Sequence, residues 1–441
     1  MLYLAVYLIF MKFIFHGGAK EVGKSCIELI TNGNRYLLDA GLKFKEHGFE
    51  APFKVFDLPH IDGLFLSHAH LDHTGSLPLF EHFNLICPIY CTQQTRELTK
   101  ILLKDSYKIA RIKHLHPAYQ KPDLKKVYAA TNIVNFDKEY TAQGITFKFL
   151  NAGHIPGSAM ILIKTEGKKI LYTGDFKLST TKLMTGARDS SQKYLTNGDL
   201  KDIDILISES TYGDKTLPER APLEEHFLDR VAEVTQQGAV VIPVFSLGRA
   251  QEILIILAKR KWNVPIYFDG MCVDMTDIIL KKDPSYLTGT ATLRQMFRKV
   301  TLVRQEQQRQ KIMNQRAIFI TTSGMVQGGP VMEYIENIWG DPNNAIFLTG
   351  FQCKRTNGRT LVDEGYLYLK GWKTTVRCAV EKFDFSGHSD DAELKTFVNL
   401  LKPKIVIFQH GDEDAVNNLC TWAEQEGYRT YGPAVGHEID L

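Results

Sequence analysis

The stretch LSHAHLDHTG, Leu66 to Gly75, places three histidines and an aspartate within six positions. They are His68, His70, Asp72 and His73. They follow the apolar run IDGLFLS, which is typical of a buried strand, so we expect them in a loop at the carboxyl end of that strand. Histidines two positions apart can share an exposed face without a function. Four metal-competent side chains together are poorly explained in that way, and the stretch predicts a metal site.

Length and composition indicate a globular chain with more than one domain. The 441 residues exceed the usual size of one compact domain. Hydrophobic residues make up 44% and the net charge is only +3, so contact with nucleic acid would depend on local basic patches. The seven cysteines are scattered and odd in number, which argues against a disulfide framework and favours a reducing compartment, the cytoplasm.

The first ten residues, MLYLAVYLIF, are apolar but too few for a membrane span, which needs about 20. They also lack the basic start and the cleavage site of a signal peptide. We expect no membrane association. Either Met11 is the natural start, or the extra residues lengthen a first strand.

The order of the expected elements indicates an α/β module inserted into a β-rich domain. Short strands with Gly and Asn turns dominate the first half. The middle alternates helices such as 221–238 with apolar strands such as AVVIPVFS, as in a parallel sheet buried on both faces. From about residue 366 the strand-and-loop pattern resumes. We therefore predict one domain made of residues 11–212 and 363–441, interrupted by an inserted domain over residues 213–362.

Polar residues recur at one type of position, directly after an apolar strand. These positions are Asp39, the segment 68–73, His154, Asp175, Glu209, His388 and His410. Loops on a rigid scaffold are where sites are built, and strand ends at one edge of stacked sheets converge in space. Solvation alone does not explain why every position carries Asp, Glu or His.

Imidazole and carboxylate ligands suit zinc, with manganese or iron as alternatives. The number of ligands fits two ions. His68, His70 and His154 would bind one ion, Asp72, His73 and His410 the other, and Asp175 would bridge them. Two ions about 3.5–4 Å apart activate water and stabilise both oxygens of a displacement at phosphorus.

Several motifs resemble a known family. HAHLDH, the Gly153–His154 pair and TGD (173–175) look like the metallo-β-lactamase pattern, whose fold is an αββα sandwich. SESTYGD (208–214), FSGHSD (385–390) and QHGD (409–412) resemble the extra motifs of the β-CASP subgroup, which carries an inserted parallel α/β domain. FSLGRAQE, TSGMVQGGP and TGFQ resemble landmarks of that insert. The resemblance covers roughly residues 13–441.

The resemblance implies a role for each site residue. The ligands are those assigned above, with Asp72 and Asp175 also counted as catalytic. Asp39 would orient ligands. His388 would be the general acid that protonates the leaving 3′ oxygen, with Glu209 raising its pKa. Ser158 and Ser389 would hold phosphate oxygens, although the PGS sequence around Ser158 also fits a plain turn.

The choice of substrate class rests on the extra motifs. Small-molecule hydrolases of this fold lack the insert. The DNA-processing branch carries Val where this chain has His410, which favours RNA. Non-catalytic scaffold subunits of RNA-processing complexes have lost ligands, whereas every ligand is present here. The prediction is a two-zinc ribonuclease acting on single-stranded RNA.

Two ribonuclease types remain open. One resembles the nuclease subunit of the cleavage and polyadenylation machinery, in an archaeal form, and would be an endonuclease in 3′-end processing. The other is the 5′-to-3′ exonuclease type of RNase J. Arg249, at an expected helix N-terminus, and Arg359 would contact the RNA backbone. The family usually has Gly at the position of Arg355, so the loop CKRTNGR departs from its pattern.

Partners beyond RNA are less defined by the sequence. The family resemblance implies that other RNA-processing subunits are candidate partners. The C-terminal stretch YGPAVGHEIDL ends in an expected strand. It either pairs between two subunits, giving a homodimer, or is an internal edge strand.

Overall fold

The computed structural model describes residues 11–45, 48–112, 114, 117–282 and 285–441. The chain forms two compact units. Unit 1 combines the chain up to Thr180 with Thr185–Thr216 and His388–Leu441, and unit 2 comprises Thr181–Met184 and Leu217–Gly387. An inserted domain is therefore confirmed. The expectation for residues 1–10 lies outside the described residues.

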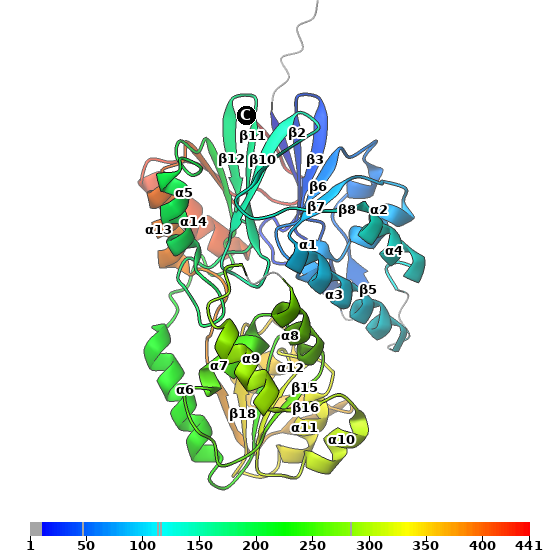
Figure 1. The fold of residues 1–441 in the computed structure, drawn as a ribbon, viewed down its shortest axis with the longest axis vertical. Helices are drawn as coiled ribbons and strands as arrows, with labels where there is room; N and C mark the ends of the chain where they lie inside the picture. Colours follow the sequence, from blue (N-terminus) through cyan, green and yellow to red (C-terminus); the bar gives the residue numbers. More distant parts are fainter. Residues whose placement is uncertain (1–10, 46–47, 113, 115–116, 283–284) are drawn as a thin grey trace, which may run out of the picture. The chain divides into compact units, whose positions relative to one another are not determined.

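Unit 1 contains two seven-stranded sheets (Figure 1). The first has the spatial order β24 (Glu438–Asp440), β1 (Lys12–Gly17), β2 (Cys26–Thr31), β3 (Asn34–Leu38), β6 (Gly63–Phe65), β7 (Ile89–Cys91) and β8 (Thr131–Ile133). The second has the order β23 (Arg429–Tyr431), β22 (Ile405–Phe408), β13 (Ile205–Ser208), β12 (Lys168–Tyr172), β11 (Ala159–Thr165), β10 (Ile145–Asn151) and β9 (Glu139–Ala142). A separate hairpin joins β4 (Lys43–Lys45) to β5 (Gly48–Glu50).

The core of unit 1 lies between the two sheets. Alternate residues of the strands face inward, so Phe13 and Phe65 of the first sheet pack with Phe147 and Ile161 of the second. The outer face of the second sheet is covered by α5 (Ala187–Thr196), α13 (Asp391–Leu401) and α14 (Glu413–Gln425). The first sheet carries α1 (Leu71–Thr74), α2 (Leu77–His82), α3 (Gln93–Ile112) and α4 (Lys121–Ala130), with a short 3₁₀ turn, η1 (Val55–Asp57). The predicted αββα sandwich is confirmed.

Strand directions bring the predicted site residues to one edge. β10 and β11 are antiparallel, as are β11 and β12, whereas β12, β13 and β22 run parallel. The carboxyl ends of β10, β12, β13 and β22 therefore meet at the same edge of the second sheet. β3 and β6 are also parallel, so their carboxyl ends share an edge of the first sheet.

Unit 2 is a parallel sheet with helices on both faces. Its strand order is β16 (Thr301–Val303), β15 (Ile266–Asp269), β17 (Ile318–Thr321), β14 (Val240–Pro243), β18 (Ala345–Leu348) and β21 (Ala379–Lys382). Ile346 and Leu348 pack towards α11 (Val331–Ile338) and α12 (Asn357–Glu364). On the other face, Phe347 contacts Phe227 of α6 (Arg220–Val234). The remaining elements are α7 (Arg249–Leu257), α8 (Cys272–Lys281), α9 (Thr290–Lys299), α10 (Glu306–Ile312), β19 (Tyr366–Leu369) and β20 (Trp372–Thr375).

The chain after α12 continues to pack with unit 2, and the predicted domain boundary at residue 363 stays a prediction. The hairpin β19–β20 follows α12, and β21 then pairs with β18 as an edge strand of the unit 2 sheet. The division between the units falls between Gly387 and His388. The strand pattern after residue 366 fits either domain, because a strand's sequence does not reveal which sheet it joins.

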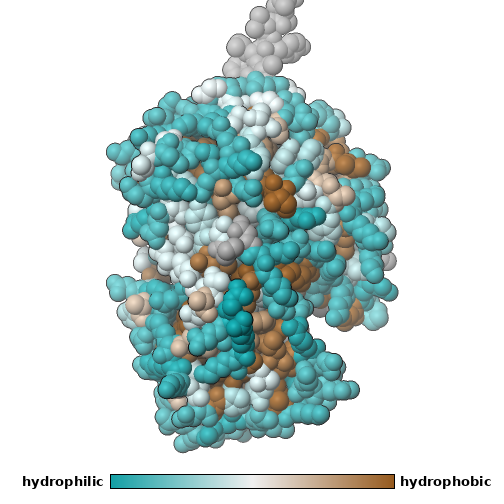
Figure 2. All heavy atoms as spheres, viewed as in Figure 1, coloured by the Kyte–Doolittle hydropathy of each residue, from teal (hydrophilic) through white to brown (hydrophobic). Residues whose placement is uncertain are grey.

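No helix of the described chain combines the length and the apolar character that crossing a membrane requires. In the view of Figure 2, hydrophilic or intermediate side chains cover most of unit 1, and strongly hydrophobic residues emerge only in separate patches.

Candidate metal centre

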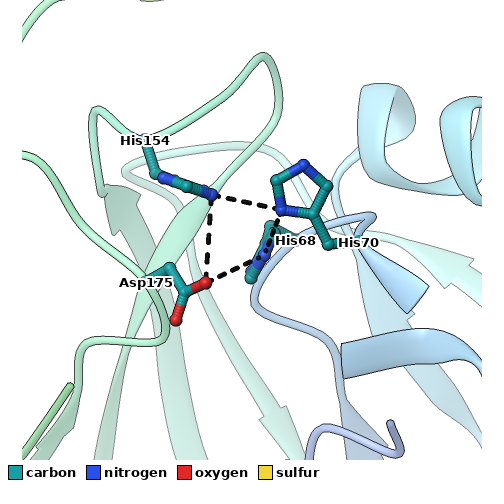
Figure 3. A group of neighbouring side chains, drawn as sticks. All are labelled: His68, His70, His154 and Asp175. Atoms are coloured by element: carbon teal, nitrogen blue, oxygen red, sulfur yellow. Dashed lines mark hydrogen bonds and ion pairs between the residues drawn. The ribbon is translucent and has the colours of Figure 1, made fainter. Parts of the chain in front are cut away.

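Four side chains from three loops converge at the sheet edge of unit 1 (Figure 3). His68 and His70 come from the loop after β6, His154 from the loop after β10, and Asp175 from the loop after β12. Their ligand atoms point towards one another. Each ligand follows the end of its strand by only a few residues, so the sheet holds the ligand atoms in place.

The spacing within this group fits a tetrahedral ion. His70 Nδ1 lies 3.2 Å from His68 Nε2 and 3.3 Å from His154 Nε2. His68 Nε2 lies 3.4 Å from Asp175 Oδ2. Metal bonds of about 2.0–2.1 Å in a tetrahedron place neighbouring ligand atoms roughly 3.3–3.4 Å apart. His154 Nε2 lies further from Asp175 Oδ2, at 3.9 Å. The four residues therefore come close to the spacing of ligands around one zinc-sized cation.

A second group shares Asp175. His73 Nε2 lies 3.3 Å from Asp175 Oδ2, and His410 Nδ1 lies 3.1 Å from Asp175 Oδ1. The other ring nitrogen of His410 lies 3.6 Å from Asp72 Oδ2. Asp175 therefore borders both groups, and its bridging of two ions stays a prediction.

Buried polar atoms within the cluster face one another without regular hydrogen bonds. His73 Nε2, His410 Nε2 and Asp175 Oδ1 are buried, and with the described residues they make ion-pair contacts of 3.1–3.6 Å but no hydrogen bond. A buried polar group without a hydrogen bond costs about 1–3 kcal/mol, which a coordinated cation would remove. The residues present fit a metal.

The electrostatics of the cluster also suit a cation. Burial lowers the pKa of His70 to about 4 and the pKa of His68 well below its usual value, so both rings are neutral ligands at neutral pH. Burial acts in the same direction on His410, but the carboxylates of Asp175 and Asp72 raise its pKa to about 10. A cation would displace the proton held there, so metal binding releases protons.

The backbone around the cluster is tightly packed. A Cβ on Gly41 would lie 1.6 Å from the carbonyl oxygen of Asp72, and a Cβ on Gly174 would lie 2.4 Å from Ser67 Cβ. Only glycine allows these approaches. Asp39 and His410 both have positive φ, 63° and 53°, a conformation that non-glycine residues adopt mostly at constrained sites.

Asp39 is fully buried and holds ligand residues in place. Its Oδ1 accepts the Ser67 backbone N–H at 2.7 Å. Its Oδ2 accepts the hydroxyls of Ser67 and Tyr172 and lies 2.7 Å from His73 Nδ1. This bond turns Nε2 of His73 towards Asp175, which is the arrangement expected of a carboxylate that orients a ligand. The orienting role predicted for Asp39 therefore has geometric support. Ser67 and Tyr172 were not predicted, since no sequence pattern marks them.

His388 and Glu209 form a pair beside the cluster. His388 Nδ1 lies 2.9 Å from Glu209 Oε2 and 3.9 Å from Asp175 Oδ2. Burial alone would lower the pKa of His388, but the Glu209 carboxylate raises it above its ordinary value. Glu209 is itself fixed, because its Oε1 accepts the Phe176 N–H at 2.6 Å. A protonated imidazole next to a metal centre is suited to general acid catalysis.

The segment after His388 is connected to the loop that carries Asp175 through Glu393, a connection that was not predicted. Glu393 Oε2 lies 2.6 Å from Lys177 Nζ, and Glu393 Oε1 accepts the Ser179 N–H. Asp390 and Glu393 also form the capping box of α13. The Asp-x-x-Glu pattern before an apolar run is a readable signal for that box, but nothing in the sequence indicates the pairing with Lys177.

The loop of His154 is anchored at two points. Ser158 Oγ accepts the N–H groups of His154 and Ile155, at 3.1 and 3.2 Å. The carbonyl oxygen of Gly157 accepts the hydroxyls of Thr92 and Thr95. Ser158 is fully buried, so in this structure its hydroxyl shapes the ligand loop. A phosphate contact by Ser158 stays a prediction.

The other predicted substrate residues lie in different settings. Ser389 is fully buried, and its Oγ accepts the Leu178 N–H at 2.9 Å. Arg249 begins α7 in unit 2, as expected, but is largely buried and paired with Glu252. Arg359, also in unit 2, is half exposed, with its Nε 2.5 Å from Asp363 Oδ2. Their roles in RNA binding stay predictions.

Comparison with known proteins places this geometry in a family. Residues 29–207 match the metallo-beta-lactamase superfamily domain, residues 250–361 the Beta-Casp domain, and residues 373–433 the Zn-dependent metallo-hydrolase RNA specificity domain. The chain is 36% identical to the probable RNase MJ4 of Methanocaldococcus jannaschii, across 98% of this chain and all of that protein. The chain belongs to the β-CASP metallo-β-lactamase family. It is a hydrolase of this family.

Other relatives agree with membership of the β-CASP family. RNase aCSPSF2 of Saccharolobus solfataricus is 32% identical over 96% of this chain and 84% of its own length. A crystal structure of a protein of unknown function from Enterococcus faecalis matches with a TM-score of 0.60 at 15% identity, covering 98% of this chain and all of that one. The latter supports the fold alone.

Proposed function

We propose that the chain is a zinc-dependent ribonuclease that cleaves single-stranded RNA internally, as in RNA 3′-end processing. The observation that carries the proposal is the His388–Glu209 pair beside Asp175. A general acid held by a buried carboxylate at the edge of a ligand cluster serves the departure of an alkoxide, which is the difficult step of phosphodiester hydrolysis.

Each residue of the candidate site has a proposed role. His68, His70 and His154 would hold one ion, Asp72, His73 and His410 the other, with Asp175 between them. When bound, the pair of ions supplies a nucleophilic water near neutral pH and stabilises charge on the phosphate. His388 holds the proton for the leaving 3′ oxygen, Glu209 keeps that ring charged and oriented, and Asp39 fixes His73.

RNA as the substrate is supported by the relatives that are named RNases and by His410. Both arginines have a carboxylate partner, but Arg359 is the better candidate for a backbone contact, because its side chain is 47% exposed whereas that of Arg249 is 8% exposed. All seven cysteines are free, which agrees with a reducing compartment, and we propose the cytoplasm. β24 pairs with β1 as an internal edge strand, so pairing between subunits stays a prediction.

The test uses a 5′-labelled single-stranded RNA, a circular RNA of the same sequence, and a DNA strand of that sequence. The protein is zinc-loaded, with its metal content measured. His388→Ala is compared with His60→Ala, which alters an exposed histidine of the same unit. We expect the circle to be cut, with a loss of roughly 10²-fold or more in His388→Ala at unchanged zinc content and no loss in His60→Ala.

Other results have definite meanings. Stepwise release of the 5′ label with an intact circle would replace the endonuclease by the exonuclease of RNase J type. Cleavage of DNA in preference to RNA would overturn the substrate. Zinc-loaded protein that cuts neither nucleic acid would favour a non-catalytic scaffold subunit.

A further inference from the structure

Two exposed phenylalanines lie side by side on the β4–β5 hairpin. The register pairs Phe44 directly with Phe49, so both rings lie on one face of the hairpin. Phe44 is 53% exposed and Phe49 is 38% exposed. Neither belongs to a hydrophobic cluster among the described residues. Two neighbouring exposed aromatic rings therefore face outward without contributing to a core.

Ion pairs hold the hairpin in place. Lys43 Nζ lies 2.6 Å from Glu21 Oε2, and Glu50 pairs with Lys24 and Lys45. The two lysines lower the pKa of Glu50 to about 2. Among the described residues, Lys24, Lys43 and Lys45 face Glu21 and Glu50, so these ion pairs leave no surplus of negative charge that would repel phosphates.

The hairpin is attached to the metal centre through its first strand. The Leu42 N–H donates to the Leu71 carbonyl at 2.9 Å, and Gly41 packs against the backbone of the ligand Asp72. Phe44 follows Leu42 by two residues, which limits the distance between their Cα atoms to about 7 Å. The strand that carries Phe44 therefore begins next to the loop that carries the ligand candidates His70 and Asp72.

We propose that Phe44 and Phe49 form a stacking platform for unpaired RNA bases that flank the scissile phosphate. The inference rests on the proposed function, because it assumes that RNA is the substrate. Aromatic rings stack on any base, so the platform would hold the strand without reading sequence, while the nearby lysines tolerate its phosphates. Stacking at this position would align the backbone with the metal cluster.

The experiment measures affinity for a short single-stranded RNA in a metal-loaded His388→Ala background, so that the RNA stays intact. The double variant Phe44→Ala/Phe49→Ala (the Ala pair) is compared with two other double variants at the same positions. Substitution of both by Leu (the Leu pair) keeps apolar bulk, and substitution of both by Trp (the Trp pair) keeps aromatic rings. Phe83→Ala alters a phenylalanine of equal exposure at the end of α2. A second RNA of equal length carries abasic positions.

We expect the Ala and Leu pairs to weaken binding about tenfold, and the Trp pair and Phe83→Ala to leave it unchanged. The salt dependence should not change, since no phosphate contact is removed. Abasic RNA should bind wild-type and Ala-pair hairpins equally weakly. Full affinity in the Ala pair, or in the Leu pair, would overturn the stacking platform.

The two proposals fail separately. If the wild-type chain cuts RNA while the Ala pair binds and cuts normally, only the platform is refuted. If the wild-type chain neither binds nor cuts RNA, the ribonuclease function is refuted and the platform falls with it. Single Phe44→Ala and Phe49→Ala variants, checked for unchanged melting temperature, exclude a folding defect.

Discussion

Lys177 and Glu393 join two loops of the candidate active site, with Nζ 2.6 Å from Oε2 and both side chains largely buried. Lys177 lies two residues after Asp175, and Glu393 lies in the first turn of the helix that follows His388. The ion pair therefore ties the predicted general acid to the predicted bridging ligand. Neither residue touches the ligand cluster itself, so we regard both as positioning residues.

Glu393→Gln should lower kcat for RNA cleavage by about tenfold or more with little change in KM. Small misplacements of a catalytic group are costly, and the substitution removes the charge while keeping the side-chain volume. Zinc content should stay the same. Lys395→Ala, which breaks the ion pair with Asp391 on the same helix, is the matched control. Equal loss in both variants would mean that only the helix was weakened.

Glu209→Gln should lower kcat by roughly 10-fold to 100-fold without removing metal. The amide oxygen can still accept the Phe176 N–H, but it no longer stabilises a charged His388. Single-turnover kinetics with excess protein separates this effect from product release. Glu81→Gln alters another buried glutamate of unit 1 and should be silent. Unchanged cleavage in Glu209→Gln would remove the pair from the mechanism.

Chelation should lower the melting temperature of unit 1. Ions present at about 100 times their Kd contribute about 2.7 kcal/mol, which for a domain of this size corresponds to a decrease of the order of 5 °C. Adding zinc should restore it. The melting temperature of Asp175→Asn should be the same with and without zinc. Asp199→Asn, a buried carboxylate paired with Lys148, should keep the zinc-dependent increase. If zinc did not change the melting temperature of the wild-type protein, the proposed metal centre would be contradicted.

Asp204 should contribute stability that depends on pH. Burial opposes its ionisation, but hydrogen bonds from Lys404 Nζ and the Lys169 N–H lower the pKa of Asp204 below its ordinary value. Between the folded pKa and the unfolded pKa of about 3.9, the unfolded chain binds more protons than the folded chain. The stabilisation by Asp204 is therefore complete above the unfolded pKa. It disappears as the pH falls through the folded pKa.

Asp204→Asn should therefore cost about 1 kcal/mol at pH 7, allowing for partial exposure, and the cost should shrink towards zero in acid. Urea unfolding of both proteins at pH 7 and near pH 3 measures the difference. Lys404→Met should reproduce part of the loss at pH 7. A cost that is the same at both pH values would show that the carboxylate charge is not involved.

Periodicity and strand-end positions were sufficient to predict the insert and the cluster of ligand candidates, and the family resemblance implied the sandwich. Apolar strands with a following Asp or His specify which residues share an edge, because strand direction is fixed by topology. The same logic predicted a helix over residues 221–238, where α6 lies, and the start of α7. It could not assign β21, since an edge strand has the same pattern in either domain.

The sequence did not predict in which direction side chains in the loops point. Ser158 and Ser389 fit a phosphate contact by residue type, yet both hydroxyls accept backbone N–H groups. Arg249 was placed at a helix start, but its pairing with Glu252 depends on the turn that follows. Polar side chains near a site satisfy the local backbone first, and sequence does not reveal which ones remain for a ligand.

The insertion also sets the order in which the active site is made during translation. Six of the seven ligand candidates precede unit 2 in the chain, whereas His410 and the acid His388 follow it. A ribosome therefore releases the whole inserted domain before the last ligand and the proton donor exist. Under the proposed mechanism a nascent or prematurely terminated chain can gather a first ion but cannot cut, so a nuclease of this design stays inert towards the message that encodes it until His388 and His410 have been made.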